Sequence, residues 1–246
     1  MRKASTEPCR LYMFDFDQTL TVFHVFKCLA GWPKQDGVGA SIPKPHAMSE
    51  LGQAARIEEL SSNEFSAEGG FPCAAFGGTG RVEEVRRLLQ SLQKQEAEMV
   101  ICTKGFVGPV QLCLNHLGLL PYFSKVYGHI GVTYGTTPFD KKVIADPPGA
   151  VATFLGQASQ AEWRSKDQLM ASLLQQRGFK WSQGILVEDD PEEIRKASRV
   201  CRTLFVKEGR GITSAHMEEL AQLAAGVEVP SANAGISGCR AACCLM

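Results

Sequence analysis

Apolar residues along the chain follow two alternating patterns. Short runs of consecutive apolar residues recur at separated positions, and between them lie longer stretches whose apolar residues are three or four positions apart. The first pattern is typical of buried parallel strands and the second of amphipathic helices. We predict strands at residues 11–14, 99–102, 126–130, 185–187 and 203–206, and helices at residues 81–95, 107–117, 167–176, 191–198 and 214–224.

The clearest helix is residues 81–95, in which Val82, Val85, Leu88, Leu89 and Leu92 would form one apolar face, with Thr79 as the expected N-cap. Strands and helices alternate along the whole pattern. This alternation predicts an α/β fold with a doubly wound parallel sheet of about five strands. In such folds, ligands bind in the crevice beyond the carboxyl ends of the strands.

Two turn-rich stretches interrupt the alternation. Residues 22–80 contain modest helical patterns on both sides of a segment rich in Pro and Gly, which predicts a small cap inserted after the first strand. Residues 131–164 form a second, loop-rich insertion. At 246 residues, the chain fits one large domain at 11–225, with an N-terminal tail at 1–10 and a flexible C-terminal tail at 226–246.

The composition excludes several classes of function. Lys and Arg together number 26, as do Asp and Glu, so no global charge attracts nucleic acid or anionic lipid. No apolar stretch matches a signal peptide or a membrane span, and the nine cysteines do not form the pattern of a disulfide framework. We therefore expect a cytoplasmic protein that does not bind nucleic acid.

Two carboxylates lie two residues apart at the end of the first predicted strand. Because side chains alternate along a strand, Asp15 and Asp17 would start on one face while Phe14 and Phe16 point to the other. Two neighbouring negative charges are unfavourable unless a cation or a shared proton offsets their repulsion. The pair therefore indicates a metal site or an acid/base site, although an isolated pair can also cap a helix or a turn.

Further polar residues follow the later predicted strands or begin the helix before one. Since the strand ends of a parallel sheet converge on one crevice, we expect these residues to meet the aspartate pair there. They are Thr103 with Lys104 and Gly105, then Lys166, and finally Glu188, Asp189 and Asp190.

With these residues in this order, the chain resembles the haloacid dehalogenase superfamily of hydrolases, over residues 11–206. The first motif matches as Asp15-Phe16-Asp17-Gln18-Thr19 and the last as Val187-Glu188-Asp189-Asp190. The resemblance implies a Rossmann-like core and a Mg²⁺ cofactor held by Asp15, Asp17 and Asp189, with Glu188 or Asp190 acting through water. The lysine motif is less specific: it fits Lys166, and Lys141 and Lys142 are the alternatives.

The resemblance also implies roles in phosphoryl transfer. Asp15 would be the nucleophile, Asp17 the acid and base, and Lys166 the catalytic lysine, while Thr103, Lys104, Gly105 and Lys166 would bind the phosphate. An acid at position 17 favours phosphate over halide chemistry. We therefore expect a Mg²⁺-dependent phosphatase that forms an aspartyl-phosphate and acts on a small phosphorylated metabolite or a phosphoprotein. The alternatives are a phosphomutase or phosphotransferase of the same fold and a non-catalytic binding protein.

The last four residues, Cys243-Cys244-Leu245-Met246, fit the prenylation pattern, with Cys243 as the acceptor of a farnesyl group and Cys239 as a site for a second lipid. One lipid alone binds a membrane weakly, so the two lipids together would attach the protein to the cytosolic face of a membrane. The alternative is an unmodified tail. The intact mass of protein isolated from its native cell decides between them.

Overall fold

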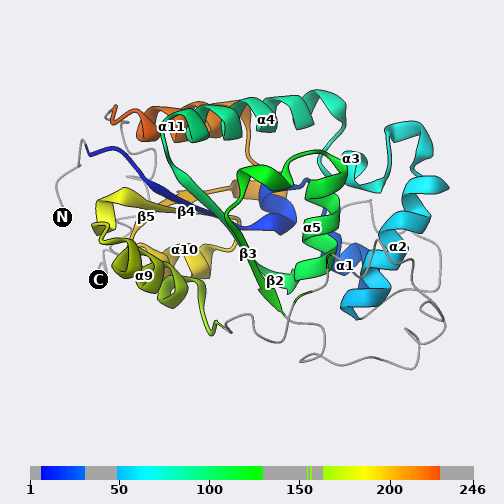
Figure 1. The fold of residues 1–246 in the computed structure, drawn as a ribbon, viewed down its shortest axis with the longest axis horizontal. Helices are drawn as coiled ribbons and strands as arrows, with labels where there is room; N and C mark the ends of the chain where they lie inside the picture. The colour runs from blue at the N-terminus through cyan, green and yellow to red at the C-terminus, as the bar shows by residue number, and fades with distance from the viewer. Residues whose placement is uncertain (1–6, 31–48, 130–153, 155, 157–162, 228–246) are drawn as a thin grey trace, which may run out of the picture.

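A parallel β-sheet forms the centre of the computed structural model, which describes residues 7–30, 49–129, 154, 156 and 163–227 (Figure 1). Within these residues the sheet has five strands in the order β3-β2-β1-β4-β5, and every neighbouring pair is parallel. This topology confirms the predicted Rossmann-like, doubly wound fold. The strands are β1 (Leu11–Phe14), β2 (Glu98–Phe106), β3 (Lys125–His129), β4 (Gly184–Glu188) and β5 (Arg202–Phe205).

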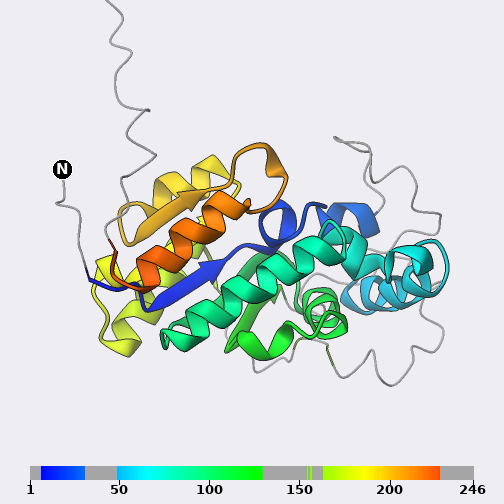
Figure 2. The same ribbon diagram turned by 90° about the horizontal axis from the view of Figure 1, so that it is seen from above.

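Helices cover both faces of the sheet because successive residues of a strand point to opposite sides. In β1, Tyr12 and Phe14 belong to the core beneath one layer of helices, whereas Leu11 and Met13 belong to the core beneath the other. The first layer contains α4 (Thr79–Lys94), α5 (Val107–His116) and α11 (Ser214–Ala224), and the second contains α9 (Lys166–Arg177) and α10 (Pro191–Ala197). Helices α4 and α11 lie side by side (Figures 1 and 2).

Within the described part of the predicted insertion at 22–80, residues 22–30 and 49–80, three α-helices lie beyond one end of the sheet: α1 (Val25–Ala30), α2 (Glu50–Ser62) and α3 (Phe71–Ala75). Ser49 caps α2 by accepting a hydrogen bond from the Gly52 N–H at 3.0 Å. Helix α2 packs on α5, so this group of helices is attached to the layer that covers the sheet. Short helical turns are found at η1 (Phe16–Leu20), η3 (Ser66–Glu68), η4 (Leu120–Tyr122), η5 (Trp181–Gln183) and η6 (Lys207–Gly209).

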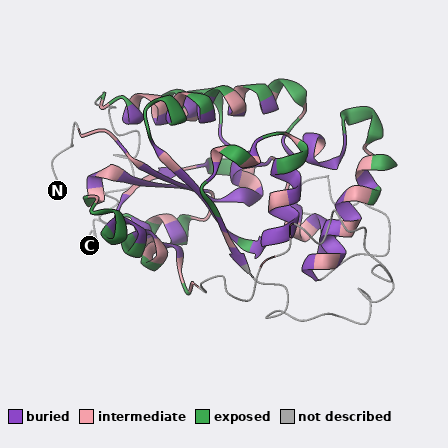
Figure 3. Ribbon diagram, viewed as in Figure 1, coloured by how far each residue is buried: buried purple, intermediate pink, exposed green. Residues whose placement is uncertain are grey.

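Helix α4 confirms the expected amphipathic pattern. Its five predicted apolar residues are buried, while the opposite side is exposed (Figure 3). Its N-cap is Gly78, with a φ of 93°, and not Thr79, which is the first residue of the helix. Glycine adopts a positive φ without the steric cost that a Cβ would add. The N-cap therefore lies one residue before the predicted N-cap.

Strand β2 extends beyond its predicted end at residue 102 and includes Thr103 and Gly105. The pairing with β3 becomes irregular between Cys102 and Phe106, where the two backbones approach closely. A Cβ on Gly128 of β3 would lie 2.8 Å from the Gly105 carbonyl oxygen, so only a glycine fits at that position. This close approach keeps the end of β2 in the sheet and places its polar residues beside β1.

Arg81, in the first turn of α4, joins three separate segments. Its guanidinium donates hydrogen bonds to the carbonyl oxygens of Leu20 at 2.7 Å, Phe76 at 2.8 Å and Ile212 at 3.1 Å. Burial lowers the pKa of Arg81 to about 10, so the group keeps its charge at neutral pH. The side chain therefore anchors the turn after β1 to α4 and to the segment before α11.

Replacing Arg81 by Met should lower the free energy of unfolding by about 2–4 kcal/mol, because partly buried carbonyl groups lose charged donors. Urea unfolding followed by circular dichroism measures this loss. Arg87→Met is the control, since Arg87 is an exposed arginine of the same helix, and its effect should stay within about 0.5 kcal/mol. Equal losses in the two variants would show that the three hydrogen bonds do not stabilise the fold.

None of the helices among the described residues has both the length and the apolar character that crossing a bilayer requires.

Candidate active site

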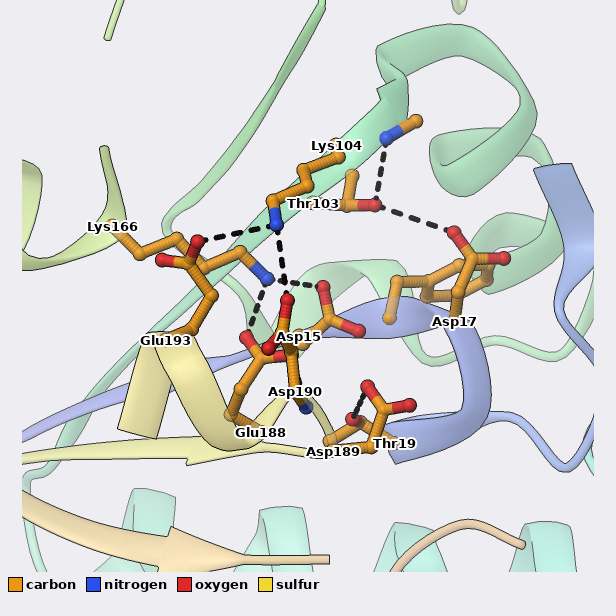
Figure 4. Close-up of polar contacts among 12 residues, drawn as sticks. Asp15, Asp17, Thr19, Thr103, Lys104, Lys166, Glu188, Asp189, Asp190 and Glu193 are labelled. Carbon is orange, nitrogen blue, oxygen red and sulfur yellow. Dashed lines mark hydrogen bonds and ion pairs between the residues drawn. The ribbon is translucent and has the colours of Figure 1, made fainter. Parts of the chain in front are cut away.

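A cavity of about 530 Å³ lies at the carboxyl ends of β1, β2 and β4. This is the place where a doubly wound sheet binds its ligands. The residues that line the cavity include Asp15, Asp17, Thr103, Lys166, Glu188 and Asp189. The structure thus brings together side chains that are up to 174 positions apart in the printed sequence (Figure 4).

Asp15 directly follows β1 and forms a buried ion-pair triad with Lys166 and Glu188. The Lys166 ammonium donates to Asp15 Oδ1 at 2.5 Å and to Glu188 Oε2 at 2.6 Å. The exposed fractions are 5% for Asp15 and 2% for each of the other two residues, so water screens these charges very little. Lys166 begins α9 and Glu188 ends β4, so the sheet topology positions all three charges.

Burial dominates the electrostatics of the triad. It raises the pKa of Glu188 to about 8, and the negative charge of Asp15 adds to this shift. Burial also raises the pKa of Asp15 to about 6, against the attraction of Lys166. Burial alone would lower the pKa of Lys166, but Asp15 and Glu188 together outweigh it and raise that pKa. Lys166 is therefore charged at neutral pH.

Asp17 lies in the short helical turn that follows β1, where Gln18 has a positive φ of 57°. The Asp17 carboxylate accepts a hydrogen bond at Oδ1 from the Phe26 N–H at 3.0 Å, and His24 Nδ1 lies 3.3 Å from the same oxygen. Its second oxygen accepts a hydrogen bond from the Thr103 hydroxyl at 3.5 Å. The turn thus directs the second aspartate toward β2 and α1, away from the Lys166 ammonium (Figure 4).

Thr103, Lys104 and Gly105 follow one another in β2 but have different environments. The Thr103 hydroxyl is buried and also accepts a hydrogen bond from the Gly105 N–H at 3.0 Å. Lys104 is more than half exposed, and its ammonium pairs with Asp190 at 3.3 Å and Glu193 at 3.1 Å. All three residues line the cavity, but Thr103 faces Asp17 whereas Lys104 bridges to α10.

Three consecutive acids lie at the carboxyl end of β4, with Glu188 as its last residue and Asp189 and Asp190 just after it, and they are also placed differently from one another. Glu188 pairs with Lys166, and Asp189 accepts a hydrogen bond from the Thr19 hydroxyl at 3.3 Å. Asp190 caps α10, accepting at Oδ1 from the Glu192 N–H at 2.8 Å. Strand β4 ends at Glu188 and α10 is capped by Asp190, so the backbone changes direction along this run and the three carboxylates reach different partners.

Three carboxylates of this site can reach one metal ion. Ligand oxygens of Asp15, Glu188 and Asp189 all lie within 4.8 Å of one another. Oxygen ligands of this kind suit Mg²⁺, which usually keeps several waters and takes one or two carboxylates from the protein. The donor set therefore fits a divalent cation. Asp15 and Asp189 belong to the predicted ligand set; Glu188, predicted to act through water, lies equally close.

The structure brings every predicted site residue within its described range to this cavity. The alternative lysines Lys141 and Lys142 and the cysteines Cys239 and Cys243 lie outside the described residues. Among the other residues of the cavity wall, His24 and Lys27 are titratable and were not predicted. Their only signal in the sequence is their position shortly after the aspartate motif, because neither forms a motif of its own.

Comparisons with known proteins find similarity between the structure of this chain and solved structures. No protein-family model and no curated protein matches the chain. Many solved structures do, among them a haloacid dehalogenase-like hydrolase from Streptococcus pneumoniae. It is 16% identical with a TM-score of 0.40, and the match covers 86% of this chain and 90% of that one.

Two further solved structures that match the chain are also described as haloacid dehalogenase proteins. The haloacid dehalogenase domain of an effector protein from Legionella pneumophila is 14% identical with a TM-score of 0.48, covering 87% of this chain and 92% of that one. A hydrolase of the same superfamily from Ehrlichia chaffeensis is 13% identical with a TM-score of 0.39, covering 92% and 98%. The chain is thus similar in structure to these three proteins at low sequence identity.

Proposed function

We propose that this protein is a Mg²⁺-dependent phosphatase that hydrolyses phosphate monoesters through an aspartyl-phosphate on Asp15. The observation that carries the proposal is the buried triad of Asp15, Lys166 and Glu188 beside Asp17 at the cavity. A carboxylate nucleophile, a fixed cation and a second carboxylate for proton transfer are the groups that this reaction needs.

In the first step, a carboxylate oxygen of Asp15 attacks the phosphorus atom and the bond from phosphorus to the ester oxygen breaks. Asp17, in its protonated form, gives its proton to that oxygen, so the alcohol leaves as a neutral molecule. Thr103 lines the same side of the cavity as Asp17, and its hydroxyl can donate a hydrogen bond to a phosphoryl oxygen. The Lys166 ammonium offsets the negative charge of the phosphoryl group.

In the second step, water attacks the phosphorus of the aspartyl-phosphate. Asp17, now ionised, accepts a proton from this water, and the bond between phosphorus and the Asp15 oxygen breaks to release phosphate. The hydrogen bond from the Phe26 N–H holds the Asp17 carboxylate in place at the cavity. One carboxylate therefore acts as acid and then as base.

Asp15 and Asp189, with the backbone carbonyl of Asp17, would hold the Mg²⁺ ion, and Glu188 lies close enough to contribute. The bound ion would neutralise phosphate charge and make attack by an anionic nucleophile feasible. The hydrogen bond from Thr19 orients Asp189 before any ion binds.

Two rival functions make different predictions. A phosphomutase or phosphotransferase would pass the phosphoryl group from Asp15 to an added sugar phosphate in preference to water. Burial of a lysine against two carboxylates carries a desolvation cost. A binding protein without catalysis would not need this arrangement. The presence of all the reacting groups in one cavity favours catalysis over binding alone.

Hydrolysis of an aryl phosphate by the purified full-length chain tests the proposal. We expect turnover with Mg²⁺ that stops when the metal is removed with EDTA and returns when Mg²⁺ is added back. The full chain should also release inorganic phosphate from a panel of small phosphorylated metabolites or phosphopeptides. Absence of Mg²⁺-dependent turnover on all of these substrates would contradict the proposed function.

A further inference from the structure

The lysines that line the cavity differ in their ionic partners. Lys166 is paired with two buried carboxylates, and Lys104 is paired with two acids at the start of α10. Lys27, which is partly buried in α1, also lines the cavity, yet no acidic partner for it is found in the part of the chain that the structure describes. Its charge is therefore available to a ligand.

Lys27 belongs to the wall of the cavity that borders Asp17. The preceding residue, Phe26, donates its backbone N–H to Asp17 Oδ1 at 3.0 Å, and His24 lies 3.3 Å from the same oxygen. In Figure 4, Asp17 lies to the right of Asp15, whereas Lys166 and Glu188 lie to its left. The wall at residues 24–27 is therefore next to the carboxylate that would protonate the leaving oxygen, so it faces the leaving group.

This wall contains the packed aromatic ring of Phe26 as well as the charged Lys27. The Phe26 ring packs against the Phe106 ring with 5.5 Å between ring centres, and Phe106 is buried at the end of β2. The packing fixes α1 against the sheet beside the reacting groups. Lys27 consequently extends from a backbone position that is held near Asp17, so pairing with an anion needs to order only its side chain.

We infer that the preferred substrate is a compact phosphate monoester whose leaving group carries a second negative charge, such as a carboxylate, which pairs with Lys27. This inference rests on the proposed phosphatase function. The phosphate would occupy the side of Asp15 and Lys166, and the second anion would lie a few bonds beyond the ester oxygen. Without Lys27, the second anion would lose its ionic partner, and the substrate would lose its advantage over a neutral analogue.

The test compares two substrates that differ in one group: 3-phosphoglycerate, which carries a carboxylate, and glycerol 3-phosphate, which carries a hydroxymethyl group there. For the wild-type protein with Mg²⁺, we expect kcat/KM to be at least about tenfold higher for 3-phosphoglycerate, because a charge-assisted pair is lost with the neutral analogue. The ratio of the two kcat/KM values is the readout, so a general loss of activity cancels.

In Lys27→Met, this ratio should fall to about one, and in Lys27→Glu it should fall below one because the introduced charge repels the carboxylate. Lys27→Arg should restore most of the preference, since arginine keeps the charge. Lys94→Met is the matched control: Lys94 is an exposed lysine at the end of α4, outside the cavity, and its ratio should equal that of the wild type.

A wild-type ratio near one, or an undiminished ratio in Lys27→Met, would overturn the inference. Its failure is distinguishable from failure of the proposed function. Hydrolysis of an aryl phosphate whose aryl group is uncharged reports on the reaction without involving a second anion. Active protein without the preference removes the role of Lys27 alone. A protein that hydrolyses none of the three esters overturns both.

Discussion

Asp15→Asn should lower kcat for hydrolysis of an aryl phosphate by at least about 10³-fold, because an amide oxygen is a poor nucleophile toward phosphorus. Asparagine has nearly the size of aspartate, so the cavity keeps its shape. Lys166 also keeps Glu188 as a buried partner at 2.6 Å, which limits the damage to the fold. The measurement is steady-state turnover with Mg²⁺, with circular dichroism and thermal unfolding to show that the variant is folded.

Asp17→Asn gives a matched comparison at the other carboxylate. An aryl leaving group needs little protonation, so the first step should continue, whereas hydrolysis of the aspartyl-phosphate should slow because no base activates the water. We expect phosphorylated Asp15 to accumulate in acid-quenched Asp17→Asn and to be absent from Asp15→Asn. Phosphorylation at a different residue, or full activity of folded Asp15→Asn, would contradict the assignment of the nucleophile.

Lys166→Met should destabilise the metal-free protein by about 3–5 kcal/mol at pH 8, since it leaves Asp15 and Glu188 buried without their cation. The penalty should shrink at lower pH. The pKa values of these carboxyls, about 6 and about 8 in the folded protein, lie above their ordinary values. A carboxyl with a raised pKa favours folding at low pH and loses this contribution as the pH rises through the folded value. The variant, without its ammonium, should show this dependence more strongly.

Urea unfolding at pH 5 and pH 8 in the presence of EDTA measures this effect. Lys104→Met is the control, because Lys104 lines the same cavity but is mostly exposed in its pairs with Asp190 and Glu193. Its loss should cost no more than about 1 kcal/mol at either pH, because Lys104 is more than half exposed and the buried Glu193 keeps Lys196 as a partner at 3.6 Å. Equal effects of the two substitutions, or a larger penalty for Lys166→Met at pH 5 than at pH 8, would contradict the structure of the triad.

Mg²⁺ should stabilise both the wild type and Lys166→Met if Asp15 and Asp189 bind it, because a ligand that binds only the folded state stabilises that state. The gain should be greater in Lys166→Met, whose uncompensated carboxylates attract the ion more strongly. Removal of the metal would therefore affect the variant more than the wild type.

Hydrophobic periodicity was sufficient to predict the architecture. Buried strands such as β1 and β4 are short, continuous apolar runs, and helices such as α4 have apolar residues at helical spacing, so local pattern and final structure agree. The errors are local. Strand β2 continues past Cys102 because Gly128 allows the backbone of β3 to approach, a contact between residues that no local pattern can predict.

For the candidate site, the sequence could predict which residues belong to it but not which of their side chains touch. The sequence alone predicted that Asp15, Asp17, Thr103 and Asp189 would meet, because the strand ends of a doubly wound sheet converge on one crevice. For the lysine it indicated only a preference for Lys166 over Lys141 and Lys142. Which groups touch was decided by the tertiary structure: Glu188 pairs with Lys166, Asp190 caps α10, and Asp17 turns toward Phe26 and His24. These contacts depend on side-chain direction and burial, which arise only when strands and helices pack, and so does the place of Lys27 in the wall beside the leaving group.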